Sequence, residues 1–271
     1  MFELSAASAA LVVVDMQNDF VRAGAPLEVP VARATIPVQR RLIDAFRSVG
    51  RPVVFTRFLA GPERTLMWNW SPVIAPPTCC CWPGVRRAYG DRVGDLECTA
   101  VIDELAPLPD EPQVEKYGYN AFHRTNLTDI LRARAVDTIV VTGTVTQICV
   151  EDTARGGFHE GFQTIVVADA VSSFDAELHR NTLRNIDMKY GRVLASDEVL
   201  NALGAPRLPS RPPADESVVR PESRTTSHVS SSEPSSHGST HDGTSPGSSV
   251  PSASSSVSRS SVSPGSSRSS R

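Results

Sequence analysis

The chain has little of what marks membrane, nucleic-acid-binding or secreted proteins. No stretch reaches the ~18 continuous apolar residues of a membrane helix, so we expect no membrane partner. The formal net charge of −3 provides no dense basic face, which argues against a nucleic-acid partner. The start of the sequence has no basic region followed by a small-residue cleavage site, so we expect no signal peptide.

Cysteine is scarce and odd in number. The five cysteines are Cys79, Cys80, Cys81, Cys98 and Cys149. In a sequence without a secretory signal, an odd count predicts reduced thiols and a cytoplasmic protein rather than a disulfide framework.

Large apolar residues become rare after Gly204. Residues 205–271 are dominated by Ser, with Pro, Thr, Gly, His and scattered Arg. Such a segment cannot bury enough apolar surface to offset the entropy of ordering, so we expect it to be disordered. Its seven arginines and five acidic residues give it a charge of +2 and leave about −5 for the rest. The composition therefore predicts one folded domain, residues 1–204, and a disordered tail, residues 205–271.

Within the first 204 residues, short runs rich in Val and Ile alternate with segments of helical spacing. The expected strands are residues 10–15, 52–56, 112–116, 137–142, 164–168 and 192–195. The expected helices are residues 31–49, 126–134, 149–160, 176–189 and 197–203. Continuous apolar strands that alternate with helices predict an α/β fold, in which a mainly parallel sheet is covered on both faces.

Three chemically capable side chains fall where these expected strands end. Asp15 ends the first strand, Lys116 ends the third, and Cys149 opens the helix after the fourth. The carboxyl ends of parallel strands meet at one edge of a sheet, so we expect the three to converge. A helix N-terminus favours a thiolate, a carboxylate can accept the thiol proton, and a lysine held inside a pocket supplies a fixed cation. Taken singly, each also has a structural explanation: a buried apolar thiol, a strand-end cap and an exposed lysine.

Three ordered motifs carry a resemblance to a known family. The sequence resembles the isochorismatase-like cysteine hydrolases over most of residues 7–200, and within them the amidohydrolase branch. The motifs are residues 11–20 (LVVVDMQNDF), residues 114–116 (VEK) followed by 120–122 (NAF) and 125–127 (TNL), and residues 141–155 (VTGTVTQICVEDTAR), which continue through 161–162 (GF) to 167–170 (VADA). The resemblance implies a three-layer α-β-α fold with a six-stranded, mainly parallel sheet.

The same resemblance implies an Asp15–Lys116–Cys149 catalytic triad. Asp15 is then the general base, Lys116 orients it, and Cys149 attacks a carbonyl carbon. A cis peptide is implied between Thr144 and Val145, which would aim the Val145 N–H into an oxyanion hole beside the N–H of Cys149. Family members commonly form dimers or tetramers, so we also expect a homo-oligomer.

The presence of Cys149 bears on the substrate class. Family members that hydrolyse the vinyl ether of isochorismate do not need a nucleophilic thiol. A complete cysteine neighbourhood therefore favours hydrolysis of a small amide, carbamoyl or ureido compound through a covalent intermediate. The alternatives left open are an isochorismatase-type vinyl-ether hydrolase and a non-catalytic scaffold whose Ser-rich tail is the interacting part.

We expect neither a metal nor another cofactor. Related nicotinamidases carry an Asp-x-His cluster after the second strand, whereas residues 56–63 here contain no His. The histidines of the first 204 residues, His123, His159 and His179, are widely separated and are interpreted as surface or capping residues. Adjacent thiols such as those of residues 79–81 do not readily surround a tetrahedral metal.

Substrate contacts are expected from residues beside the triad and from a long irregular region, residues 57–96. Long loops in compact domains are commonly functional. The candidates are Gln17, Phe20, Arg57, Trp68 and Trp70. A solvated strand-end role for Arg57, and burial of the tryptophans in a subunit interface, are equally open.

Overall fold

The computed structural model describes residues 2–204. These residues form an α/β domain around a six-stranded sheet with the order β5-β2-β1-β6-β7-β8, and every pairing in it is parallel. The predicted fold class is confirmed. The expected disordered tail, residues 205–271, lies outside the described residues.

The strands of the main sheet are built from the Val- and Ile-rich runs of the sequence. They are β1 (Ala9–Val14), β2 (Val53–Phe58), β5 (Gln113–Lys116), β6 (Thr138–Thr144), β7 (Gln163–Ser172) and β8 (Arg192–Leu194). Every residue of β1 and of β6 is buried, as expected for central strands of a parallel sheet with both faces covered.

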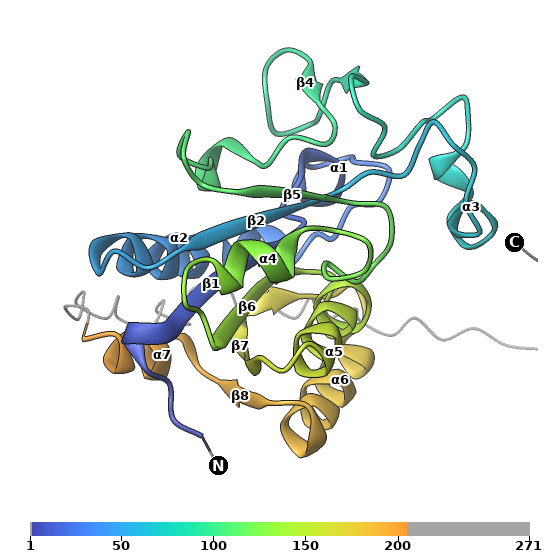
Figure 1. Ribbon diagram of the computed structural model, residues 1–271. Coiled ribbons are helices and arrows are strands. Elements are labelled where there is room, and N and C mark those ends of the chain that lie inside the picture. The colour runs from blue at the N-terminus through green and yellow to red at the C-terminus, as the bar shows by residue number, and fades with distance from the viewer. Residues whose placement is uncertain (1, 205–271) are drawn as a thin grey trace, which may run out of the picture. The chain divides into compact units, whose positions relative to one another are not determined.

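Helices cover both faces of this sheet (Figure 1). One core cluster joins Leu11 and Val13 to apolar side chains of α2 (Ala32–Ser48) and α7 (Ser196–Ala202). A second joins Val12 and Val14 to side chains of α4 (Leu127–Arg132), α5 (Glu151–His159) and α6 (Ala176–Lys189). Successive side chains of β1 therefore pack in two separate cores, one on each face of the sheet.

The long irregular region contains only short elements. They are α3 (Met67–Trp70), the paired strands β3 (Arg86–Arg87) and β4 (Leu96–Glu97), and the 3₁₀ turns η2 (Pro72–Ile74) and η3 (Asp103–Leu105). Near the N-terminus lie η1 (Ala6–Ser8) and α1 (Asn18–Val21). In residues 2–204, none of the helices is long and apolar enough to cross a membrane.

The strands after β1 are added on one side of it, β2 and then β5, whereas β6, β7 and β8 are added on its other side. The strand order therefore changes direction between β1 and β6, which lie side by side at the centre of the sheet. Ligands of open α/β sheets bind at such a switch point, beyond the carboxyl ends of the strands. Close approach of the two strands there depends on Gly143, which pairs with Val14 and has φ +109°. A Cβ at this position would lie 2.0 Å from the carbonyl oxygen of Val14, so no larger residue fits.

Replacement of Gly143 by alanine should therefore be severely destabilising. We expect Gly143→Ala to lower the free energy of unfolding by more than ~3 kcal/mol, because a steric clash adds to an unfavourable backbone conformation. Gly161 is the matched control, since it also has positive φ (+86°) but leaves open space for a methyl group. Gly161→Ala should cost only about 1 kcal/mol in the same urea titration. Equal losses in the two variants would contradict the close-approach explanation.

Candidate active site

Asp15 lies directly after β1 in a conformation that few non-glycine residues adopt. Its φ is +48°, and its side chain is fully buried. The hydroxyl of Thr56 on β2 donates to Asp15 Oδ1 at 2.6 Å, and the Asp15 backbone N–H donates to Thr56 Oγ1 at 3.2 Å. These two bonds fix both the backbone and the carboxylate.

Lys116, the last residue of β5, forms an ion pair with this carboxylate. Its Nζ lies 2.7 Å from Asp15 Oδ2, and both side chains are 0% exposed. The ammonium also donates to the carbonyl oxygen of Gly118 at 3.0 Å and lies 5.1 Å from the centroid of the Phe58 ring. Burial alone would lower the pKa of Lys116, but the charges of Asp15 and Cys149 and the hydrogen bonds to their side chains together outweigh burial, and the pKa is raised. Lys116 is therefore a permanent cation.

Cys149 lies in η4 (Thr146–Val150), a π-helical turn that precedes α5. The sequence predicted an α-helix beginning at Cys149, so the helix start was wrong by two residues. π-helical turns are rare and often occur at functional sites. The Cys149 side chain is buried, and the residue is 4% exposed.

The electrostatics of the thiol link it to the ion pair. Burial raises the pKa of Cys149, the charge of Lys116 lowers it, and the charge of Asp15 raises it again, with a net increase. Because both charges act on the thiol, the structure brings the three predicted residues together at one edge of the sheet. The raised pKa favours the neutral thiol at neutral pH.

The backbone before Cys149 has an unusual path. The peptide bond between Thr144 and Val145 is cis. The next residue, Thr146, is hydrogen-bonded through its Oγ1 to Nδ1 of His179 on α6 at 2.9 Å. His179 was interpreted from the sequence as a surface or capping residue, but it is half-buried and contacts the turn that holds Cys149.

Two substrate-contact candidates lie close to the triad but have structural partners. The side-chain amide of Gln17 donates from Nε2 to the carbonyl oxygen of Phe58 at 3.1 Å and accepts from its N–H at 2.6 Å. Phe20 is buried, with its ring 6.2 Å from that of Phe58. Both residues therefore hold the end of β2 in place, and the substrate-contact role of Gln17 and Phe20 stays a prediction.

The other three candidates point elsewhere. Arg57 is one residue along β2 from Thr56, so its side chain takes the opposite face of the sheet, where it pairs with Glu115. Trp70 is 83% exposed on α3. Trp68 donates from Nε1 to the carbonyl oxygen of Ala60 at 2.9 Å and packs against Trp82. Arg57 and Trp70 are thus not brought to the triad.

Three residues near the triad were not anticipated. Besides Thr56, they are Tyr119 and Asp152. The pKa of half-buried Tyr119 is raised first by burial and then by the charge of Cys149. Burial also raises the pKa of Asp152, while Lys116 lowers it. Two of these residues could have been found from the sequence. Thr56 ends the second expected strand and Tyr119 lies shortly after Lys116, so both are polar residues at the predicted edge of the sheet.

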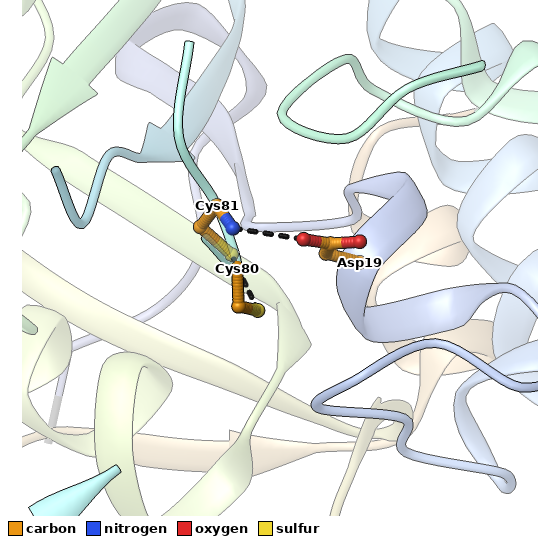
Figure 2. Close-up of side chains that lie close together, drawn as sticks. All are labelled: Asp19, Cys80 and Cys81. Atoms are coloured by element: carbon orange, nitrogen blue, oxygen red, sulfur yellow. Dashed lines mark hydrogen bonds between the residues drawn. The ribbon is translucent and has the colours of Figure 1, made fainter. Parts of the chain in front are cut away.

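A second cluster of potential ligands is formed by side chains outside the triad (Figure 2). In the described part of the chain, the grouping with metal-binding potential is Asp19, Cys80 and Cys81, all buried. The two sulfurs are 3.6 Å apart, and the Cys81 N–H donates to Asp19 Oδ2 at 2.8 Å. All five cysteines are free.

The carboxylate of this cluster already has its partners. Asp19 Oδ1 accepts from the Tyr89 hydroxyl at 2.7 Å and lies 3.1 Å from Nε of Arg87. Burial raises the pKa of Cys81, which favours the neutral thiol. A satisfied carboxylate beside neutral thiols tethers the loop to α1 and is a poor donor set for a metal ion.

The comparison with protein families agrees with this geometry. A family model described as the isochorismatase domain matches residues 9–198. The match covers well over half of the chain, so the protein belongs to the isochorismatase family.

Two similar curated proteins are ureidoacrylate amidohydrolases. The ureidoacrylate amidohydrolase RutB of Methylobacterium radiotolerans is 34% identical over 225 residues, which cover 78% of this chain and 84% of the relative. RutB of Stutzerimonas stutzeri is 30% identical, with 74% and 85% covered.

Solved structures include a cysteine hydrolase from Pseudomonas syringae pv. phaseolicola, which has a TM-score of 0.68 at 28% identity and covers 75% of this chain and 96% of its own. The N-carbamoylsarcosine amidase of Thermoplasma acidophilum has a TM-score of 0.56 at 33% identity, with 70% and 97% covered. These are the proteins that this chain is similar to.

Removal of one partner of the buried ion pair should be costly. We expect Lys116→Met to lower the free energy of unfolding by about 3–5 kcal/mol, because it leaves the buried Asp15 carboxylate without compensation. The control is Arg132→Met, which breaks an exposed pair with Glu160 (3.9 Å) and should cost under ~0.5 kcal/mol. Restoration of stability by the double variant Asp15→Asn/Lys116→Met would support the explanation; a Lys116→Met protein as stable as the control variant would contradict it.

Proposed function

We propose that this protein is a cysteine hydrolase that cleaves the C–N bond of a small amide, carbamoyl or ureido compound. The observation that supports it most directly is the buried Asp15–Lys116 pair, 2.7 Å apart, with both charges acting on the thiol of Cys149. Few structural roles require a carboxylate, an ammonium and a thiol in one buried group. Perturbed and mutually coupled groups of this kind are typical of catalytic sites.

The first chemical step is attack by sulfur. Asp15 takes the proton of the Cys149 thiol, and the sulfur forms a bond to the carbonyl carbon of the substrate. Transfer of this proton is needed because burial keeps the resting thiol neutral. Lys116 holds Asp15 in place and offsets the negative charge that develops on the sulfur and the oxygen.

The carbonyl oxygen then becomes an oxyanion. The backbone N–H groups of Val145 and Cys149 are the proposed donors to it, since Val145 directly precedes the turn that carries the nucleophile and Cys149 lies within it. Collapse of the tetrahedral intermediate breaks the C–N bond. The leaving nitrogen takes the proton from Asp15 and departs as ammonia or an amine, and a thioester or thiocarbamate remains on Cys149.

Water completes the cycle. Asp15, again a carboxylate, accepts a proton from the attacking water, and the hydroxyl adds to the acyl carbon. The C–S bond breaks, the proton returns to the sulfur of Cys149, and the acid is released. One base therefore serves both halves of the reaction, which is consistent with its rigid support by Thr56 and Lys116.

The names of the relatives support the same class of bond. Ureidoacrylate amidohydrolase, maleamate amidohydrolase and N-carbamoylsarcosine amidase all act on non-peptide C–N bonds. A vinyl-ether hydrolase is the less favoured alternative, because that reaction gives the thiol no role. A homo-oligomer, dimeric or tetrameric, remains part of the proposal.

The nucleophile can be tested directly. We expect Cys149→Ala to lower kcat for ammonia release from amides and ureides by at least ~10³-fold, because no other group replaces the sulfur. Intact-mass spectrometry of the wild-type protein, quenched during turnover, should show an acyl adduct on the peptide that contains Cys149. Cys79→Ala, which changes a thiol away from the site, is the control and should leave the rate unchanged. Wild-type turnover by Cys149→Ala would refute the thiol mechanism.

The proposed chemistry requires no metal. Among residues 2–204 the grouped ligands are those around Asp19, and its carboxylate is engaged by Arg87, Tyr89 and the Cys81 N–H. Dialysis against a chelator should therefore leave kcat within about twofold, because the reaction uses only groups that remain in place. Elemental analysis before and after dialysis is the accompanying measurement. A loss of activity that is restored by added zinc would overturn metal independence.

A further inference from the structure

One side of α6 carries three polar side chains that contact the neighbouring π-helical turn and the start of α5, which lies beside α6 (Figure 1). They are His179, Thr182 and Asn185, which recur every three residues and therefore lie along one side of the helix. Nδ1 of His179 and Oγ1 of Thr146 are joined by a hydrogen bond of 2.9 Å. The Thr182 hydroxyl donates to Oε2 of Glu151 at 2.8 Å, and Asn185 Nδ2 donates to Oε1 at 3.3 Å. α6 therefore holds both η4 and the start of α5.

These contacts lie on both sides of the nucleophile in the sequence. Thr146, three residues before Cys149, is the first residue of η4, whereas Glu151, two residues after it, is the first residue of α5. The Glu151 carboxylate also accepts from Nε of Arg155 at 3.0 Å, so it keeps a partner if one donor is lost. Among residues 2–204, the Thr146 hydroxyl has one hydrogen-bond partner, which is His179. The turn before Cys149 is therefore more sensitive to the loss of one contact than α5 is.

The first turn of α6 is a firm support for His179. Asp175 caps the helix, because its Oδ1 accepts from the N–H groups of Glu177 and Leu178 at 2.9 and 2.8 Å. The Asp175 N–H donates in turn to Oγ of Ser173 at 2.8 Å. The His179 N–H donates to the carbonyl oxygen of Asp175 at 3.0 Å, which continues the helix from its cap. His179 is thus one turn inside a well-capped helix.

The His179 ring is half-buried and neutral at neutral pH. Burial lowers the pKa of His179, and the charge of Arg180 lowers it further. A neutral imidazole has one donor and one acceptor nitrogen, so it can form a hydrogen bond with the Thr146 hydroxyl without adding a charge to the turn. The role of the contact is therefore to hold the turn in position.

We infer that His179 is a positioning residue, which acts on the reaction through its hydrogen bond with Thr146. The bond holds the turn so that the N–H groups of Val145 and Cys149 stay directed at the oxygen that becomes charged. The inference rests on the proposed function, since the oxyanion hole is part of that mechanism. Val145 directly precedes Thr146, so a displacement of Thr146 moves the first donor. Removal of one oxyanion donor typically lowers kcat by about 10²–10³-fold, and a displaced donor should cost less.

Two substitutions in the full-length protein separate the hydrogen bond from the ring. His179→Phe keeps a ring of similar size and removes both nitrogens. His179→Asn loses the ring but places an amide near the position of Nδ1, and this amide can donate or accept. We expect His179→Phe to lower kcat for ammonia release about 10- to 100-fold and to change KM less than about threefold, because the bonds to the oxyanion form only in the transition state. His179→Asn should restore kcat to within about threefold of the wild-type value.

The partner residue gives a second, independent pair of variants. Thr146→Val removes the hydroxyl at similar volume and should match His179→Phe, whereas Thr146→Ser keeps the hydroxyl and should match the wild type. The double variant His179→Phe/Thr146→Val should be no slower than His179→Phe, because both changes remove the same bond. His159→Phe, at an exposed histidine of α5, is the control and should leave kcat unchanged. Urea titration gives the folded fraction of each variant, and kcat is calculated per folded molecule. If His179→Phe does not fold, the Thr146 pair decides the question.

Three results would overturn the positioning role. The first is wild-type kcat in His179→Phe or in Thr146→Val. The second is a change confined to KM, which would mean that His179 acts on substrate binding. The third is a fall in kcat that His179→Asn does not restore, which would mean that the ring itself is needed for packing.

Hydrolysis of p-nitrophenyl acetate separates this inference from the proposed substrate class. The sulfur of Cys149 forms a bond to the acetyl carbon, the thiol proton passes to Asp15, and the C–O bond breaks to release p-nitrophenolate through the same kind of oxyanion. Release that depends on Cys149 and His179, without ammonia release from any amide, would count against the proposed bond class alone. Ammonia release that depends on Cys149 but not on His179 would count against the positioning role alone. Absence of both reactions in the wild-type protein would overturn both.

Discussion

The buried ion pair between Asp15 and Lys116 is the constraint around which the rest of the domain is arranged. Two opposite charges with no solvent exposure must be closely paired, because neither recovers its lost hydration in any other way. Asp15 follows β1 and Lys116 ends β5, and these two strands are not neighbours, since β2 lies between them. Thr56 and Phe58 of β2 bridge the gap, one through a hydrogen bond to the carboxylate and one beneath the ammonium.

The pair also sets the reactivity of the thiol. Burial raises the pKa of Cys149, so the free enzyme carries a neutral and weakly nucleophilic sulfur. The charge of Lys116 lowers the pKa of Cys149, but burial and the charge of Asp15 together raise it by more. In the proposed mechanism, the proton therefore moves only when the carbonyl carbon of a substrate is in place for the sulfur to attack. An enclosed thiol of this kind is protected from alkylation and oxidation, which depend on thiolate and on access.

The sequence predicted the sheet, its flanking helices and the three central residues, because each depends on a local pattern. Val-rich runs define buried strands, and polar residues at their ends mark one edge. The errors came from information that a local pattern lacks. Thr56 and Arg57 are adjacent in β2, so their side chains lie on opposite faces of the sheet. The sequence alone does not say which of the two faces Asp15. The ion pair between Arg57 and Glu115 of β5 shows that Arg57 is on the other face. The π-helical turn before α5 and the exposure of Trp70 likewise depend on tertiary packing.

The residues of the proposed mechanism and the irregular loops beside them differ in how tightly they are held. Asp15, Lys116 and the turn with Cys149 follow strands whose register is fixed by two apolar cores, so their positions tolerate little change. A pocket of about 680 Å³ at the carboxyl ends of β2 and β5 is lined by the loops that follow these strands, and among its lining residues Glu63, Tyr117 and Arg124 are exposed. Divergence in substrate preference within this fold is therefore expected to act on exposed residues of these loops before it acts on the ion pair.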